Sequence, residues 1–228
     1  MAHLLIINPN TSEHVTALIL RHAQAAAGVG HHIEAVTARF GAPYISDEAS
    51  YAIATHATLD AWTHWLQGAK LAGTPDVDGV LIACFGDPGL FALREVCPCP
   101  VSGLAEAAFE EAQHHGRFAV VTGGARWRPM LERLAAGLGI QGNALVGIDT
   151  VEATGAQLAA DRAAAHTLLV QACRAARERT GAQAIILGGA GLAGMAAPIA
   201  AELGFAVIDS VVAGTQRALQ RAAGRKVT

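Results

Sequence analysis

Cys84 is the residue of this chain best placed to do chemistry, because it lies between a short apolar run and a turn. The run at 80–83 (VLIA) is typical of a strand buried on both faces, and the Gly-Asp-Pro-Gly sequence at 86–89 ends it. Ligands of parallel α/β sheets bind just outside the carboxyl ends of the strands, so this strand would carry the thiol to such a site. The helix predicted at 90–96 would stabilise a thiolate at its start, although a buried cysteine can also serve packing alone.

The composition limits the partners of the chain. Its 228 residues are 52% hydrophobic and 15% charged, and a net charge of −3 without a basic stripe argues against nucleic acid. No apolar run approaches the roughly 18 uncharged residues of a transmembrane helix, and the sequence starts with an apolar strand rather than a signal peptide. We therefore expect a cytoplasmic protein that acts on a small molecule, without a membrane or nucleic-acid partner.

The remaining cysteines and the histidines predict no metal site. Cys97 and Cys99 flank a single proline, which is too close for an ordinary disulfide, and they lack a second pair of ligands. Cys173 lies inside a predicted helix and suits packing. The histidines at 56–64 have no carboxylate or histidine partner at ligand spacing. The spacing of the four cysteines shows no disulfide framework, so reduced thiols are expected.

Strands alternate with helices along the chain, which indicates an α/β fold with parallel sheets. We expect strands at 3–7, 33–38, 80–83, 117–121, 184–187 and 206–209, and a short strand or turn at 98–101. Helices are expected at 13–27, 47–72 (as one helix or two), 90–96, 105–114, 127–138, 156–178, 196–203 and 213–223. The segment 148–151 is expected to be a connector.

The two halves of the chain repeat a pattern. The strand before Asn8-Pro-Asn matches the strand before Thr122-Gly-Gly, and 82–86 (IACFG) matches 187–191 (LGGAG). This repeat predicts two similar lobes, one formed by 1–103 plus 208–228 and the other by 104–207. Ligand sites favour such interfaces, so the cleft between the lobes would have Cys84 on one side and the loop at Gly189 on the other.

Several motifs together resemble the aspartate/glutamate/hydantoin racemase superfamily, and most closely its hydantoin and allantoin racemase branch. They lie at 7–12 (INPNTS), 83–89 (ACFGDPG), 103–107 (GLAEA), 120–122 (VVT) and 188–194 (GGAGLAG). The resemblance implies two α/β lobes, no cofactor, and two cysteines that flank the α-carbon of the substrate. One thiolate then removes the α-proton and the opposite thiol returns a proton to the other face. The first of these cysteines corresponds to Cys84.

The chain departs from this pattern at the second cysteine. Where the family has Gly-Cys-Ala-Gly, the sequence reads Gly-Gly-Ala-Gly at 188–191, so Gly189 stands in the place of the second proton carrier. A positioned acid–base group is typically worth about 10²–10⁴ in rate. Racemisation by one cysteine or with the help of water stays open, because hydantoin α-protons are comparatively acidic.

The glycine loops and the polar residues at the strand ends would complete the site. Backbone N–H groups in these loops can bind an enolate oxygen, and Asn8 and Thr122 can add side-chain donors. Asp87 can orient a substrate N–H or cap a helix, and Tyr44 and Ile45 are candidate pocket walls. The candidate substrate-binding residues are Asn8, Pro9, Tyr44, Ile45, Phe85, Gly86, Asp87, Thr122, Gly123, Gly189, Ala190 and Gly191.

Three functions follow, of which a racemase-type isomerase stands first. The second is a one-cysteine lyase or decarboxylase that protonates an enolate on one face, as a related decarboxylase of the superfamily does. The third is a non-catalytic ligand-binding relative. No arginine lies on a strand-end loop to bind a second carboxylate, which favours a hydantoin-like or aryl-bearing substrate. Trp62 and Trp65, with the resemblance, suggest a homo-oligomer.

Overall fold

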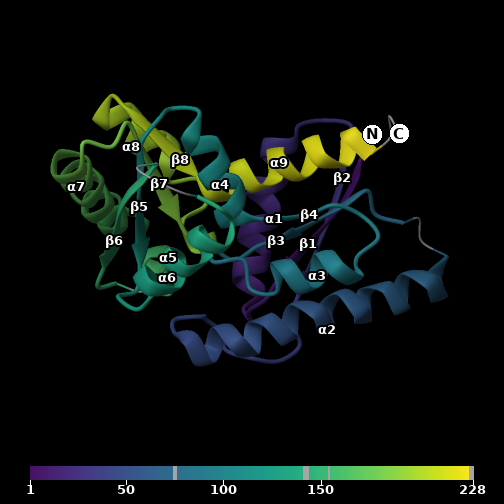
Figure 1. Cartoon of the computed structure of the whole chain (residues 1–228). Helices are drawn as coiled ribbons and strands as arrows, with labels where there is room; N and C mark the ends of the chain where they lie inside the picture. Colours follow the sequence, from purple (N-terminus) through teal and green to yellow (C-terminus); the bar gives the residue numbers. More distant parts are fainter. Residues whose placement is uncertain (74–75, 141–143, 154, 226–228) are drawn as a thin grey trace.

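The computed structural model describes residues 1–73, 76–140, 144–153 and 155–225, which form two parallel sheets flanked by helices (Figure 1). The first sheet has the order β2-β1-β3-β4, from β1 (His3–Asn8), β2 (His32–Thr37), β3 (Gly79–Ile82) and β4 (Val101–Gly103). The second has the order β6-β5-β7-β8, from β5 (Phe118–Gly123), β6 (Leu145–Val151), β7 (Ala184–Gly188) and β8 (Ala206–Asp209). The predicted fold class is confirmed.

Helices connect successive strands in both halves. Those of the first half are α1 (Glu13–Ala27), α2 (Glu48–Ala72), α3 (Leu90–Val96) and α4 (Leu104–Gln113). Those of the second half are α5 (Trp127–Gly137), α6 (Gly155–Ala160), α7 (Arg162–Thr180), the 3₁₀ turn η1 (Ala190–Leu192) and α8 (Ala196–Leu203), followed by α9 (Ser210–Arg225). None of the helices in the described part of the chain has the length and apolar character needed to span a bilayer.

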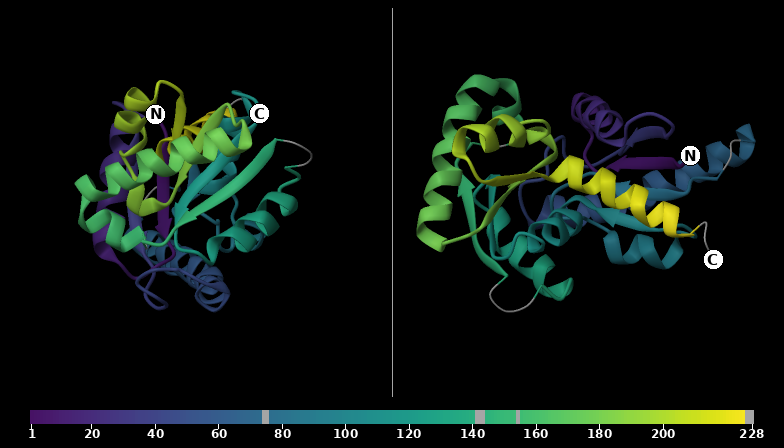
Figure 2. Two further views of the ribbon diagram at one scale, coloured as in Figure 1. Left: turned by 90° about the vertical axis from the view of Figure 1, so that its left-hand side faces the viewer. Right: turned by 90° about the horizontal axis from the view of Figure 1, so that it is seen from above.

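The identical strand order of the two sheets explains the sequence repeat, since β1, β2, β3 and β4 correspond to β5, β6, β7 and β8. The chain passes between the sheets twice. It enters the second through α4 and returns through α9, which packs against α1 and α4 and runs back along the first sheet (Figure 2). The lobe boundaries at 103/104 and 207/208 stay a prediction.

Two expected elements were wrong. The segment 148–151 belongs to β6, an edge strand that pairs only with β5 among the described strands. Most of its residues are half-buried, so it lacks the continuous apolar run that reveals a central strand. The long helix expected at 156–178 is two helices, because the side chain of Asp161 accepts a hydrogen bond from the Ala164 N–H (3.0 Å) and begins α7.

The helix α2, expected as one helix or two, is continuous. In α2, Asp47 and Ser50 form a reciprocal capping box, and no break interrupts the helix before Ala72. Trp62 is buried in the core of the first sheet, and Trp65 stacks on it with ring centroids 5.6 Å apart. The two tryptophans therefore pack within the chain, and the homo-oligomer stays a prediction that rests on the resemblance.

Candidate active site

Cys84 lies just beyond the carboxyl end of β3, held by a tight turn. The N–H of Ala83 donates to the Ile7 carbonyl (2.8 Å), which extends the sheet up to the cysteine. The Asp87 N–H then donates to the Cys84 carbonyl (3.0 Å) and closes the turn. Only 8% of Cys84 is exposed. The strand and the turn together fix the thiol at the position that the sequence predicts for it.

The strand registers identify the residue that corresponds to Cys84 in the second lobe. Ile82 pairs with Ile7 in the first sheet, and Leu187 pairs with Val121 in the second. Since Cys84 comes two residues after Ile82, its counterpart two residues after Leu187 is Gly189. The topology thus supports the equivalence of Cys84 and Gly189 that the sequence repeat suggested.

A cavity of about 90 Å³ lies where the strand ends of the two sheets meet. Nine of the thirteen predicted site residues line it: Tyr44, Ile45, Cys84, Phe85, Thr122, Gly123, Gly189, Ala190 and Gly191. Its other described wall residues are Asn10, Ser12, Val15, Pro43, Ala83, Trp127, Gly188 and Leu192. The cavity therefore combines one thiol, a few hydroxyl and amide groups, and a largely apolar wall.

Four predicted site residues are not among the wall residues of the cavity. Asn8 is fully buried, and its side-chain N–H group donates to Asn10 (3.0 Å) and Thr16 (2.9 Å), so it holds the turn before α1. Pro9 lies in the same turn. The Gly86 carbonyl accepts a hydrogen bond from the Tyr51 hydroxyl (2.8 Å). Asp87 caps α4 instead of facing the cavity.

Asp87 connects the cysteine turn to the start of α4. Its two carboxylate oxygens accept from the N–H groups of Ala105 (2.9 Å) and Glu106 (2.8 Å), and its φ is +52°. A Cβ at Gly103 would lie 2.1 Å from the Asp87 carboxyl carbon, so glycine is required there. Glu106, in the first turn of α4, pairs with Arg94 (2.6 Å) and Arg221 (2.7 Å).

Two aromatic rings pack closely against glycines of the opposite lobe and shape the cavity wall. The sequence predicted a site role for Phe85 but not for Trp127. The Phe85 ring occupies the place of a side chain at Gly188, since a Cβ there would meet the ring at 2.3 Å. The Trp127 ring likewise fills the space beside Gly86, where an added Cβ would lie 2.4 Å from a ring carbon. An aromatic residue at the start of the helix after the Thr122 turn was the one available signal for Trp127. Leu192 lies within the glycine motif at 188–194 and was a candidate for setting the pocket size, whereas Val15 carried no such signal.

The loop before α2 reaches from the first lobe to the second. The Tyr44 hydroxyl donates to the Gly123 carbonyl (3.2 Å). Asp47 pairs with Arg126 (3.3 Å), and Glu48 pairs with Arg133 through two contacts of 2.5 and 2.9 Å. The loop at 39–46, which contains the predicted pocket residues Tyr44 and Ile45, thus forms part of the cavity wall and is tied to α5.

The other three cysteines do not line the cavity. Cys97 and Cys99 are buried with their sulfur atoms 3.4 Å apart, in the core of the first sheet. Cys173 lies fully buried on α7 in the core of the second sheet, and burial raises the pKa of its thiol to about 12. Cys84 is therefore the only cysteine of the sequence on the cavity wall.

This geometry agrees with comparisons to known proteins. The model of the Asp/Glu/Hydantoin racemase family matches residues 4–218. The chain belongs to this family. It is 36% identical to a hydantoin racemase of Pseudomonas sp. (strain NS671) over 212 residues, or 92% of this chain and 82% of that protein. It is 34% identical to a hydantoin racemase of Paenarthrobacter aurescens over 211 residues, or 92% and 86%.

A solved structure gives the same result. Allantoin racemase from Klebsiella pneumoniae matches with a TM-score of 0.89 and 33% identity, and the match covers 99% of this chain and 89% of that one. The resemblance to the hydantoin and allantoin branch of the Asp/Glu/hydantoin racemase family is thereby confirmed. The replacement of a second catalytic cysteine by Gly189 stays a prediction.

Burial controls the protonation of the acidic groups at this racemase-family site. It raises the pKa of the Cys84 thiol well above its usual range, and the nearby Asp87 carboxylate raises it further. Burial also raises the pKa of Asp87 to about 7, against the opposing effect of its hydrogen bonds from Ala105 and Glu106. This raised pKa favours the neutral thiol form of Cys84, which can donate a proton.

The raised pKa of Asp87 gives a testable pH dependence of stability. Between its ordinary value of 3.8 and about 7 the folded protein holds a proton on Asp87 that the unfolded chain has lost. The free energy of unfolding therefore decreases as the pH rises through this window. We expect the wild type to lose about 2–3 kcal/mol more than Asp87→Asn between pH 5 and pH 8, in urea unfolding. Equal losses in both proteins would show that Asp87 is already ionised at pH 5.

Proposed function

We propose that this chain is a cofactor-independent isomerase that inverts an acidic α-carbon of a hydantoin-like substrate by acid–base chemistry at Cys84. The observation that carries the proposal is the position of Cys84, the only cysteine on the wall of a cavity between the two lobes. Membership of the racemase family supports the reaction class. The names of the hydantoin and allantoin racemase relatives support a cyclic amide or ureido substrate.

The reaction needs proton transfer at the α-carbon and hydrogen bonds to the enolate oxygen. Cys84 exchanges the proton on its own face of the carbon, cycling between thiol and thiolate. Water removes or supplies the proton on the face of Gly189, which has no acid–base side chain. The N–H groups of Ala190 and Gly191, at the start of η1, have no acceptor among the hydrogen bonds of the described residues and can donate to the enolate. Thr122 is less free to do so, because its hydroxyl already donates to the Gly188 carbonyl (2.7 Å).

The cavity wall favours an uncharged substrate. No lysine, arginine, aspartate or glutamate is among the described residues that line it. A free dicarboxylate would therefore lose its hydration without gaining a charged partner. A hydantoin ring hydrogen-bonds through its N–H and C=O groups, and Val15, Ile45, Trp127 and Leu192 can contact an apolar substituent at its α-carbon.

The proposal is tested by proton NMR and polarimetry of single-enantiomer 5-substituted hydantoins and of allantoin, with the protein in D₂O. Loss of the α-proton signal together with loss of optical rotation is expected for a racemase. Deuterium uptake with retained rotation would mean that the protein exchanges the proton on one face only. Absence of exchange on all of these substrates would contradict the proposal and favour the one-cysteine lyase or the non-catalytic ligand-binding function.

A one-cysteine lyase is the second candidate, and the position of Gly189 favours it. With glycine in the place that corresponds to Cys84, a substrate could lose carbon dioxide on the Gly189 side while the neutral Cys84 thiol protonates the other face. Carbon dioxide release from aryl-substituted malonates, giving one enantiomer of the product, would support this function. Carbon dioxide release from these malonates is the next assay if the hydantoins do not react.

A further inference from the structure

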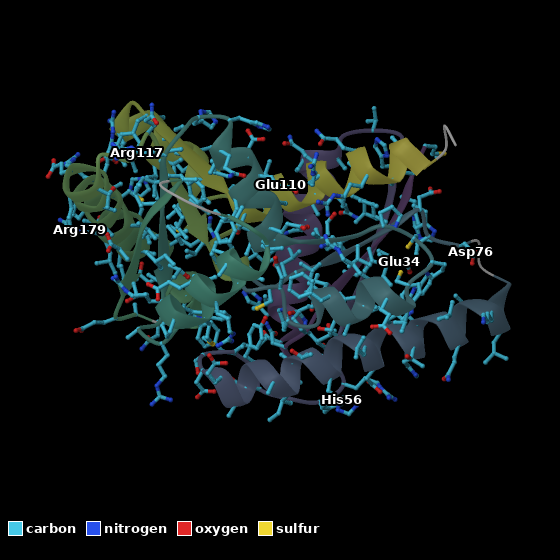
Figure 3. The ribbon with its side chains drawn as sticks, viewed as in Figure 1. Glu34, His56, Asp76, Glu110, Arg117 and Arg179 are labelled. Atoms are coloured by element: carbon cyan, nitrogen blue, oxygen red, sulfur yellow. The ribbon has the colours of Figure 1, made fainter. Side chains whose placement is uncertain are left out.

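Two histidines and a glutamate meet at the end of the first sheet that lies away from the catalytic cavity. His3 begins β1 and His32 begins β2, whereas Cys84 follows the opposite, carboxyl end of β3. Glu34 lies towards the right-hand end of the molecule, far from Arg179 of the second lobe (Figure 3). This cluster of His3, His32 and Glu34 takes no part in the proposed reaction.

The strand register brings the three side chains to one face. His3 and His32 are paired residues of the parallel strands β1 and β2. Glu34 follows His32 by two residues, and alternate residues of a strand point to the same side of a sheet. The sequence alone gave no sign of this, because His3 is about thirty positions away from the other two.

The ligand atoms of the cluster are already close together. His3 Nε2 lies 2.8 Å from Glu34 Oε1, and the rings of His3 and His32 have centroids 4.5 Å apart. One nitrogen from each histidine and one carboxylate oxygen all lie within 4.8 Å of one another. Among the described residues, no other group of three histidine, cysteine or acidic side chains meets this distance.

We propose that His3, His32 and Glu34 bind a divalent transition-metal ion of the zinc type. Two imidazole nitrogens and one carboxylate oxygen are a ligand set that Zn²⁺ accepts, with water in the fourth position. Bonds of about 2.0–2.1 Å in a tetrahedron place ligand atoms roughly 3.3 Å apart. The His3–Glu34 pair therefore has to open by only about half an ångström.

Surrounding charge and burial support the site. The side-chain exposures of His3 and Glu34 are 14% and 33%, so the ion would be partly shielded yet reachable from solvent. The Asp78 carboxylate accepts a hydrogen bond from the backbone N–H of His3 (2.8 Å) and adds negative charge beside the site. His32 is exposed and can adjust its ring. The bound ion would add a side-chain link between β1 and the edge strand β2, which already pair through their backbones.

The test is a titration of the full chain with zinc chloride, by calorimetry and thermal unfolding. We expect one Zn²⁺ per chain, and at a concentration 100 times the dissociation constant a rise of roughly 5–10 °C in Tm. His32→Asn changes an exposed residue and should weaken binding by about 100-fold. Glu34→Gln is the second variant, which retains the shape of the side chain and should have the same effect.

Matched controls separate this site from other possible ligands. His114 and His115 lie beside Glu111 on the surface, at 3.6 and 3.9 Å, and the double variant H114N/H115N should bind Zn²⁺ like the wild type. The double variant C97S/C99S removes the close thiol pair and should also retain binding. Unchanged affinity in both His32→Asn and Glu34→Gln, or loss of binding in either control, would overturn the proposal.

A second measurement locates the ion. The Trp65 ring lies edge-on to His3, with centroids 6.5 Å apart. Binding of Cu²⁺, which prefers the same nitrogen ligands, should quench the fluorescence of Trp65 in the wild type. The quenching should disappear in His32→Asn and persist in H114N/H115N. Equal quenching in all three proteins would place the ion elsewhere and contradict the site.

Discussion

Replacing Cys84 by serine is expected to reduce α-proton exchange on hydantoin substrates by about 10³-fold or more, because the variant loses its proton carrier. A serine hydroxyl is a much weaker acid than a thiol, yet it nearly retains the size of the side chain. The Cys84 side chain makes no hydrogen bond among those of the described residues, and the turn is held by the Cys84 carbonyl, so the fold should persist. Exchange of the α-proton in D₂O, followed by NMR, measures the effect.

Cys99→Ser is the matched control for this experiment. Cys99 is also buried, with 6% exposure, but it lies in the core of the first sheet and not on the cavity wall. Its substitution should leave the exchange rate within a fewfold of the wild type after correction for the folded fraction. An active Cys84→Ser protein would remove the thiol from the reaction and leave family membership as the only support for an isomerase.

The position of the catalytic candidate could be predicted because its signals are local. A four-residue apolar run followed by Gly-Asp-Pro-Gly defines the end of β3, and the chain repeats that pattern before Gly189. The parallel sheets follow from the same alternation. By contrast, β6 is a half-buried edge strand in which Gly147 and Asp149 interrupt the apolar residues, so it lacks the continuous run that marks a central strand.

Polar residues beside the site were harder to assign. Asn8 and Asp87 stand in turns next to the strand ends, where a substrate contact was a reasonable expectation. Short polar side chains in such turns also satisfy nearby backbone groups, and both residues do this. Trp127 and Val15 reach the cavity from the first turns of helices in different lobes. Their role depends on how the lobes pack, which no local pattern shows.

The second large effect is expected from Gly189→Cys, which would place a thiol opposite Cys84. A Cβ at Gly189 would meet only Leu192, at 3.5 Å, so the cavity has room for the side chain. The backbone is less permissive, since φ is +145° and ψ is 129° at this position. A residue other than glycine in this conformation destabilises the folded protein by about 1–3 kcal/mol. We expect a less stable protein that nevertheless racemises its substrate faster than the wild type.

Gly189→Ala separates the two consequences, because it adds the same backbone strain without a proton carrier. Both variants should show a similar decrease in Tm. Only Gly189→Cys should then gain racemisation, by about 10² or more over Gly189→Ala, measured as loss of optical rotation. If Gly189→Cys and Gly189→Ala have equal rates, the added thiol does not reach the α-carbon.

The double variant C84S/G189C tests whether positions 84 and 189 serve opposite faces of the α-carbon. If residues 84 and 189 lie on opposite faces of the α-carbon, this variant should exchange the α-proton on the face of residue 189. In the wild type only water can transfer a proton on that face. In the wild type, where Cys84 is the one thiol on the cavity wall, deuterium should enter one enantiomer preferentially, and the double variant should prefer the other. The same preference in both proteins would contradict the mirrored arrangement of β3 and β7, on which the one-cysteine mechanism depends.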